Sequence, residues 1–224
     1  MATSVGTTRP VVQDRDDALM RVIAWIKAHR QLSLWVAVIV VVGGGLLWWN
    51  ALSTRQSEQN AGRALAAARL AFESRNFPLA SSELSRIIAN YSGTHAAQEA
   101  NLLLAQVRLA QGQSQSAIEL LRRFAPAASR EFRAQAYGLL GGAYENVAHP
   151  KEAAEAYQQA AEMAPMPFLR AQFLSDAGRA WTTAGDTAKA VAAYREIVTK
   201  LDSTNTVMEA KVRLGELTRG VLPK

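Results

Sequence analysis

The chain has 224 residues, and its 25 Lys+Arg against 19 Asp+Glu give a formal net charge of +6. This basic excess is mild and spread along the chain, which argues against nucleic-acid binding. The absence of cysteine excludes a disulfide framework, a cysteine-ligated zinc site and a thiol nucleophile. The three histidines, His29, His95 and His149, lie far apart in sequence, and the motifs of nucleotide-binding and hydrolase sites are absent. We therefore expect a protein that is not an enzyme, with no catalytic residues, metal site or cofactor.

An uncharged run of 24 residues, 31–54, predicts a single transmembrane helix near the N-terminus. A helix needs about 20 residues to cross a hydrocarbon core of roughly 30 Å. Trp35 near one end and Trp48 and Trp49 near the other are expected as membrane anchors. A buried core helix is one alternative, although such long charge-free runs are rare in globular domains. A cleaved signal peptide would have a shorter apolar region and small residues at its end, so we expect an uncleaved signal anchor.

The flanks of this run predict its orientation, because basic residues are more numerous before it than after it. We expect the N-terminus in the cytoplasm of a bacterium and residues 55–224 across the inner membrane, in the periplasm. Residues 16–30 have an apolar helical face and predict either a juxtamembrane amphipathic helix or a solvated extension of the span. Residues 1–15 are small and polar and are expected to form a disordered cytoplasmic tail. Gly43–Gly45 is either a close-packing surface for another membrane helix or a tolerated soft spot.

Residues 55–224 contain an internal repeat. Four segments share an alanine within a helical pattern, at spacings of 37, 36 and 37 residues: Ala80, Ala117, Ala153 and Ala190. Twelve residues before each alanine is a small residue, and four residues after it is a large one: Ala68, Ala105, Gly141 and Gly178, then Leu84, Leu121, Tyr157 and Tyr194. These offsets predict pairs of antiparallel helices that approach at the small residues. The large residues are expected to fill the gap to the neighbouring pair.

Residues that favour the start of a helix support the same division of the chain into repeats. Pro78 and Pro150 are expected in the first turn of second helices, where a missing N–H is not costly. Asp186 and Ser114 precede the corresponding helices of the other repeats as expected caps. Residues 206–219 predict one more amphipathic helix, whose apolar residues would cover the end of the stack: Val207, Ala210, Val212, Leu214 and Leu217. We expect about nine helices in this part of the chain and no strand.

Residues 137–165 resemble the tetratricopeptide repeat, and the next segment matches the same pattern. The matching positions are Leu140–Gly141, Tyr144, Ala153, Tyr157, Ala160 and Pro165, followed by Gly178, Trp181, Gly185, Ala190 and Tyr194. The resemblance implies an all-α fold, an α-solenoid of about four helix pairs with a C-terminal capping helix. The repeat period of 36–37 exceeds the usual length of about 34 residues and implies lengthened turns between repeats.

The same resemblance implies a concave groove that binds partner proteins and is lined by the first helix of each pair. By alignment, the groove-facing residues are Arg69, Phe72, Glu73, Glu99, Leu102, Gln106, Leu109, Gln135, Glu145, Asn146, Gln172, Ser175, Arg179 and Thr182. The lining is polar and mixed in charge, so it lacks a basic clamp for a peptide carboxylate. The alternative for each of these residues is an ordinary solvated helix face.

The whole-chain arrangement is similar to the ancillary Sec translocon subunit family. The similar features are a tail with Trp25 and Lys27, a span that ends in GLLWWN, and a helix-rich repeat domain. The resemblance implies a membrane-anchored periplasmic adaptor whose partners are proteins of an inner-membrane complex and periplasmic chaperones, with lipid contact through the span. The alternative is a permanent structural subunit of a large photosynthetic or respiratory complex. An enzyme with an unrecognised site is a third hypothesis.

Overall fold

The computed structural model describes residue 20, residues 30–202 and residues 204–220. Within the first helix, the side chains of residues 30, 32–34, 36–37, 46–47 and 50–51 are not described. The chain divides into two compact units, Met1–Arg55 and Gln56–Lys224. The expected tail 1–15 and nearly all of the expected juxtamembrane helix 16–30 lie outside the described residues.

Helix α2 (Arg30–Glu73) contains the whole uncharged run. In the first unit, the side chains of Trp35, Trp48 and Trp49 are 69%, 68% and 68% exposed. A Cβ added to any of Gly43–Gly45 would meet no atom within 4 Å. Among the residues that the structure describes, no helix combines the length and the apolarity that a membrane crossing requires.

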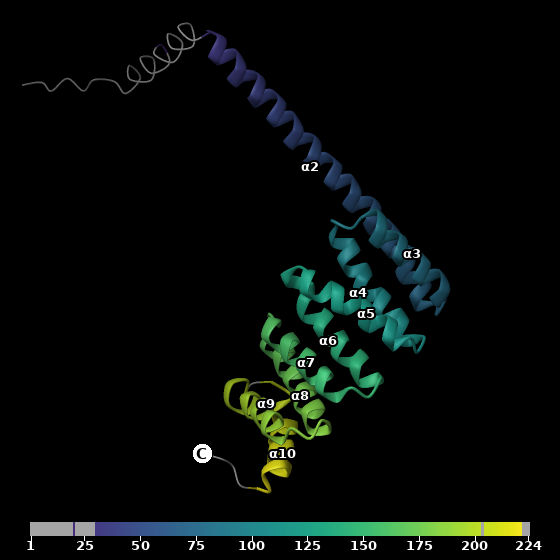
Figure 1. The fold of residues 1–224 in the computed structure, drawn as a ribbon, viewed down its shortest axis with the longest axis vertical. Helices are drawn as coiled ribbons and strands as arrows, with labels where there is room; N and C mark the ends of the chain where they lie inside the picture. Colours follow the sequence, from purple (N-terminus) through teal and green to yellow (C-terminus); the bar gives the residue numbers. More distant parts are fainter. Residues whose placement is uncertain (1–19, 21–29, 203, 221–224) are drawn as a thin grey trace, which may run out of the picture. The chain divides into compact units, whose positions relative to one another are not determined.

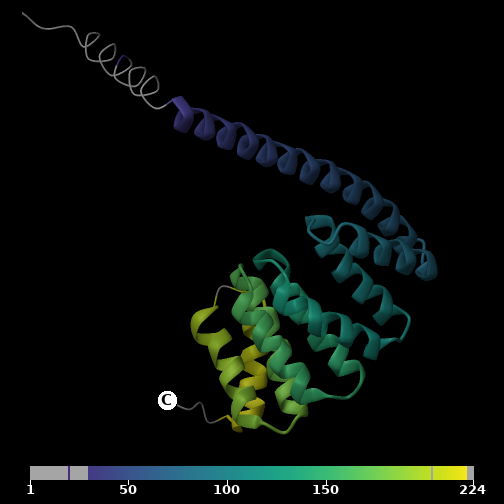
Figure 2. The ribbon, with the colours of Figure 1, turned by 45° about the horizontal axis from the view of Figure 1, so that its top comes forward.

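The second unit contains the end of α2 and eight further helices, with no strand among its described residues. They are α3 (Phe77–Asn90), α4 (His95–Ala110), α5 (Ser114–Ala127), α6 (Arg130–Asn146), α7 (Pro150–Met163), α8 (Pro167–Thr183), α9 (Thr187–Lys200) and α10 (Val207–Thr218). Consecutive helices pack against one another, so that helical hairpins follow each other through the unit (Figures 1 and 2). The expected all-helical repeat fold is therefore confirmed for the described residues.

The same turn ends the first helix of every hairpin. Its central residue has a left-handed backbone, with φ of 57°, 73°, 56° and 79° at Arg75, Gly112, Ala148 and Gly185. The next residue donates its N–H to the carbonyl oxygen five residues earlier, at 2.8–3.0 Å: Asn76 to Ala71, Gln113 to Arg108, His149 to Tyr144 and Asp186 to Trp181. This is the Schellman motif, which provides hydrogen-bond donors to carbonyl groups that would otherwise have none at the end of the helix. Glycine fits this position best, yet two repeats have Arg75 or Ala148 there.

The expected helix starts are confirmed in three of four cases. Pro78 and Pro150 lie in the first turns of α3 and α7, and Asp186 caps α9 by accepting the N–H of Lys189 at 3.1 Å. The expected cap at Ser114 is wrong, because the turn ends one residue earlier. Gln113 occupies the cap position without a side-chain hydrogen bond, and Ser114 is the buried first residue of α5.

The expectation of lengthened turns between repeats is wrong for most of the stack. The turns 91–94, 128–129 and 164–166 are short, and only 201–206 is longer. The first helices α6 and α8 are instead 17 residues long, against 14 residues in each second helix, α3, α5, α7 and α9. Much of the additional length of each repeat, relative to the usual length of about 34 residues, therefore lies in the first helices.

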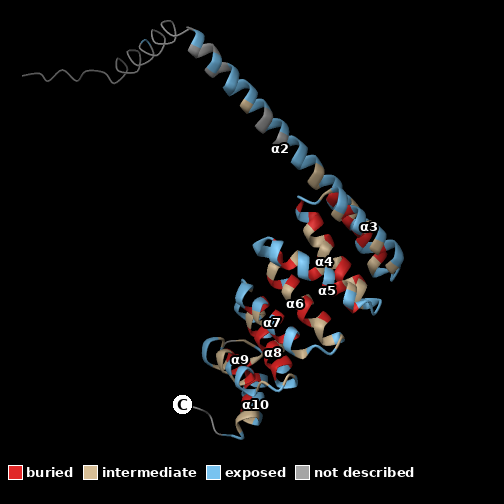
Figure 3. Ribbon diagram, viewed as in Figure 1, coloured by how far each residue is buried: buried red, intermediate tan, exposed pale blue. Residues whose placement is uncertain are grey.

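The core lies between the helices as a series of apolar clusters (Figure 3). A Cβ on Gly141 would lie 2.7 Å from the ring of Tyr157, and one on Gly178 would lie 2.6 Å from the ring of Tyr194. Each tyrosine therefore packs on the small residue of its own hairpin. A spacing of 16 residues places each tyrosine opposite its glycine across the antiparallel hairpin. Both tyrosines also belong to the core cluster that includes the following first helices, α8 and α10, so they pack toward the neighbouring pair as expected.

Helix α10 packs mainly against α9 through one face, where Val207, Ala210 and Leu214 are buried. Val212 was expected on this covering face, but its side chain is 58% exposed. The expectation is wrong because Val212 lies outside the stripe formed by these three residues, which recurs every three to four positions. α10 therefore covers the end of the stack while exposing apolar surface of its own.

Candidate partner-binding surfaces

The sequence-predicted groove residues divide into exposed, half-buried and buried groups. Glu73, Gln135, Asn146, Gln172 and Thr182 are exposed, whereas Gln106 and Leu109 are half-buried. Phe72 is also half-buried and packs against a core cluster, with its ring centroid 6.0 Å from that of Phe77. Leu102 and Ser175 are buried, so these two residues do not face a partner. The remaining four predicted residues form ion pairs.

Two arginine–glutamate ion pairs join the first helices of consecutive hairpins. Arg69 of α2 pairs with Glu99 of α4, and Nη1 of Arg179 on α8 lies 2.5 Å from Oε1 of Glu145 on α6. Both arginine side chains are about half exposed, so each pair contributes only about 0–1 kcal/mol. All four charges were predicted as partner contacts, but the structure shows that they already have partners within the repeat domain.

The second of these pairs belongs to a polar cluster that spans α6, α7 and α8. Oη of Tyr157 donates to Oε2 of Glu145 at 2.9 Å, and Nη2 of Arg179 donates to Oδ1 of Asp176 at 2.9 Å. Arg179 therefore lies between two carboxylates from different helices. Sequence alignment placed Glu145 and Arg179 on the same face but did not find the contribution of Tyr157, which comes from the second helix of the hairpin.

The cluster shifts the pKa of three of its members. Burial, followed by the hydrogen bond to Glu145, raises the pKa of the Tyr157 hydroxyl. Burial also raises the pKa of Asp176, and the hydrogen bond and charge of Arg179 only partly oppose this shift. Burial acts to lower the pKa of Arg179, but hydrogen bonds to Asp176 and Glu145 outweigh it and raise the pKa. Arg179 therefore stays charged, while partial burial makes the ionisation of Asp176 less favourable than in water.

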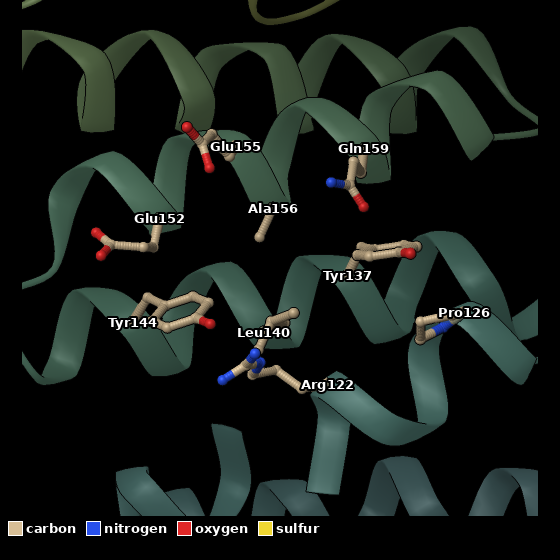
Figure 4. A pocket seen from close by; sticks show the side chains of 9 residues that line it. All are labelled: Arg122, Pro126, Tyr137, Leu140, Tyr144, Glu152, Glu155, Ala156 and Gln159. Carbon is tan, nitrogen blue, oxygen red and sulfur yellow. The ribbon is translucent and has the colours of Figure 1, made fainter. Parts of the chain in front are cut away.

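A separate cleft opens between α5, α6 and α7, with a cavity volume of about 260 Å³ (Figure 4). Its lining comes from three helices: Arg122 and Pro126 from α5, Tyr137, Leu140 and Tyr144 from α6, and Glu152, Glu155, Ala156 and Gln159 from α7. The three α6 residues follow each other at intervals of three and four, which places them on one helix face. We call this surface the α5–α7 cleft.

The α5–α7 cleft combines aromatic surface with unpaired charges. Arg122 and Glu155 form no ion pair or side-chain hydrogen bond with another described residue. Glu152 is less free, because its Oε1 lies 3.7 Å from Nδ1 of His149, whose ring stacks on Tyr144 with centroids 6.3 Å apart. The cleft can therefore take an apolar side chain against the tyrosines, with a carboxylate near Arg122 and a cation near Glu155. Alignment of the first helices alone missed this cleft, although the spacing of Tyr137, Leu140 and Tyr144 was visible in the sequence.

Neither surface has the residues of a metal site. Among residues 30–202 and 204–220, no three His, Asp or Glu side chains lie close enough together to ligate a metal ion.

Comparison with known families identifies the fold. The family described as Tetratricopeptide repeat-like domain matches residues 55–166, which is half of the chain. This chain belongs to that family. A second tetratricopeptide repeat family matches residues 139–205, so the two matches together cover both repeats in which the motif is clear from the sequence. Tetratricopeptide repeat proteins are scaffolds for protein–protein interaction, and their fold is typically not enzymatic.

Solved structures show the same tetratricopeptide repeat fold. The crystal structure of MamA protein has a TM-score of 0.57 at 19% identity, over 71% of this chain and 81% of that one. A Podosopora anserina putative kinesin light chain with nearly identical TPR-like repeats has a TM-score of 0.56 at 19% identity, over 73% of this chain and 87% of that one. At this identity the likeness concerns the fold alone. No curated protein sequence matches the chain.

Proposed function

We propose that this tetratricopeptide repeat protein is a membrane-anchored scaffold that binds partner proteins beside an inner-membrane complex. The observation that carries the binding role is the α5–α7 cleft, where aromatic surface and unpaired charges are open to a partner. The whole-chain resemblance favours the Sec translocon as the complex and periplasmic chaperones as further partners. The runner-up is a permanent structural subunit of a photosynthetic or respiratory complex.

The membrane anchor of this proposal rests on the sequence. Residues 31–54 are uncharged, and tryptophans lie near both ends of the run. Basic residues before the run favour a cytoplasmic N-terminus and a periplasmic repeat domain. In this arrangement the anchor would tether the repeat domain to the membrane.

The α5–α7 cleft is better suited to a partner than the first-helix face. Arg69 and Arg179 would have to leave Glu99 and Glu145 before they could bind a foreign carboxylate, and the broken pairs would offset the gain. Arg122 and Glu155 have no such internal partners to lose. Gln172 and Asn146 on the first-helix face remain exposed and offer weaker, uncharged contacts.

The topology can be tested by labelling single cysteines, because the natural chain has none. Thr8→Cys marks the N-terminal tail, and Glu162→Cys marks an exposed position at the end of α7. In intact spheroplasts, a membrane-impermeant maleimide should label Glu162→Cys at once and Thr8→Cys only after lysis. The opposite pattern would overturn the orientation, and release of the protein by alkaline carbonate would overturn the anchor.

The partner surface can be tested by site-specific photo-crosslinking in native membranes. A photoreactive phenylalanine at Tyr144 reports on the α5–α7 cleft, one at Gln172 on the first-helix face, and one at Arg86 on the exposed side of α3 as control. We expect a crosslink from Tyr144 to translocon or chaperone proteins, weakened by Arg122→Glu. Crosslinks from Gln172 alone would overturn the choice of cleft. Crosslinks to a pigment- or quinone-bearing complex, at a constant stoichiometry between that complex and this protein, would favour the structural-subunit alternative.

A further inference from the structure

Helix α10 repeats the register of the first helices. In each of the four repeats, a small residue lies twelve positions before the shared alanine, and the same spacing continues to Gly215. The residues are Ala68, Ala105, Gly141, Gly178 and Gly215, at spacings of 37, 36, 37 and 37 residues. Gly215 lies in α10, which is the last helix that the structure describes. By its register, α10 is therefore the first helix of a fifth repeat.

The small residues of the third and fourth repeats are covered by a second helix, whereas no described residue covers Gly215. Tyr157 of α7 covers Gly141, and Tyr194 of α9 covers Gly178. A Cβ on Gly215 would meet no atom within 4 Å among the described residues. In the part of the chain that the structure describes, the position that receives a large side chain in the preceding hairpins is therefore open on α10.

Apolar surface surrounds this open position. Met208 is 69% exposed and Val212 is 58% exposed. Met208, Lys211, Val212 and Gly215 follow each other at intervals of three, one and three residues, which places them along one stripe of the helix. We call this stripe the outer face of α10. The buried residues Val207, Ala210 and Leu214 lie outside it and hold α10 against the stack.

We propose that the outer face of α10 binds an amphipathic helix of a partner protein. The preceding hairpins define the helix that fits: a small residue, then Leu or Tyr four residues later, as in Ala153 and Tyr157 of α7. The large residue would lie on Gly215 and bury Met208 and Val212. Lys211 has no ion-pair partner among the described residues, so an acidic helix would be preferred. This inference concerns a different surface from the α5–α7 cleft and does not depend on the proposed anchor.

The chain itself supplies a suitable probe, because the α7 segment has the required pattern and an acidic balance. The probe is a fluorescein-labelled peptide of residues 149–164, held helical by a covalent staple between positions 155 and 159, which are exposed in α7. The staple overcomes the low helicity of so short a free peptide, and the label reports its binding. Binding to the full-length protein in mild detergent is measured by fluorescence anisotropy.

The decisive comparison is between Gly215→Leu and Gly62→Leu. Both glycines are helical with no atom within 4 Å of an added Cβ, so neither change should disturb the fold, which circular dichroism would check. We expect Gly215→Leu to weaken peptide binding at least tenfold and Gly62→Leu to leave it unchanged. A peptide with Tyr157→Ala should also bind at least tenfold more weakly.

Three outcomes would overturn the proposal. One is no saturable binding of the peptide to the natural protein, and another is equal binding by Gly215→Leu and Gly62→Leu. The third is a dimer of the natural protein in sedimentation that Gly215→Leu converts to a monomer, because the occupant of the outer face would then be a second copy. None of these outcomes affects the crosslinks expected from the α5–α7 cleft.

Discussion

The ring of Tyr157 packs directly on the backbone of Gly141, where a Cβ would lie only 2.7 Å from the ring. The hydroxyl of the same tyrosine donates to Glu145, and Glu145 pairs with Arg179 of the next repeat. One side chain therefore fixes the distance between α6 and α7 and orients a carboxylate that joins two repeats. The stability of this hairpin should depend on both contacts.

Gly141→Ala should destabilise the repeat domain, and Gly215→Ala is its matched control. The new methyl group at Gly141 must displace the Tyr157 ring, at a cost of about 1–3 kcal/mol. At Gly215 the space is open, and the better helix propensity of alanine should stabilise by roughly 0.5–1 kcal/mol. Urea denaturation monitored by circular dichroism measures both changes. Equal stability of the two variants would contradict the packing of Tyr157 on Gly141.

Ala148→Gly should stabilise the protein, because Ala148 holds a left-handed backbone with φ of 56°. Such a conformation costs a non-glycine residue about 1–2 kcal/mol, which the substitution relieves. The greater flexibility of glycine in the unfolded chain offsets a part of this gain. We expect a net gain of about 0.5–1 kcal/mol in the free energy of unfolding. The reverse change at the equivalent turn, Gly185→Ala, should lower stability by about 1–2 kcal/mol. Thermal unfolding of both variants tests the prediction, and a stabilising Gly185→Ala would refute it.

The Arg69–Glu99 pair should contribute little to stability, although it occupies the first-helix face. A double-mutant cycle of Arg69→Ala and Glu99→Ala should give a coupling energy of about 0–1 kcal/mol, because both side chains are partly solvated. Raising the salt concentration should reduce the coupling further. A coupling energy well above this range would mean that the pair is more strongly desolvated than the structure shows.

Asp176→Asn should change how stability depends on pH. Burial raises the pKa of Asp176 from its ordinary value of 3.8, so the folded protein holds this proton more tightly than the unfolded chain. The contribution of Asp176 is therefore most favourable below about pH 3.8 and is lost as the pH rises through its raised value. The stability of the natural protein relative to Asp176→Asn should fall over this range. Denaturation of both proteins between pH 3 and pH 7 gives the difference, and a relative gain with rising pH would mean that the pairing with Arg179 dominates.

The repeat architecture was predictable because it depends on spacings along one chain. The period of 36–37 residues, the prolines at helix starts and the cap at Asp186 all follow from local rules. The cap at Ser114 failed because the turn geometry at Gly112, rather than the residue type, decides where α5 begins. The prediction for Val212 failed because α10 has apolar residues on two faces, one with Val207 and Leu214 and one with Met208 and Val212, and the pattern does not reveal which face is covered.

The contacts between repeats were not predictable from the alignment. Arg69 and Arg179 lie on first helices, but their ion-pair partners are 30 and 34 residues away in sequence, on neighbouring hairpins. Whether two surface charges meet depends on rotamers and on the small rotation between repeats, and neither is encoded in a repeat pattern. The α5–α7 cleft was missed because it combines second helices with a first helix, whereas the alignment considered first helices alone.

The packing of each helix mainly against its neighbours in sequence has a consequence for synthesis. Contacts between residues close in sequence form quickly, and chains dominated by them fold fast. In this protein each hairpin joins the preceding one through nearby helices, so early repeats can assemble before later ones have left the ribosome. The order in which the repeats are translated is then also the order in which their structure can grow.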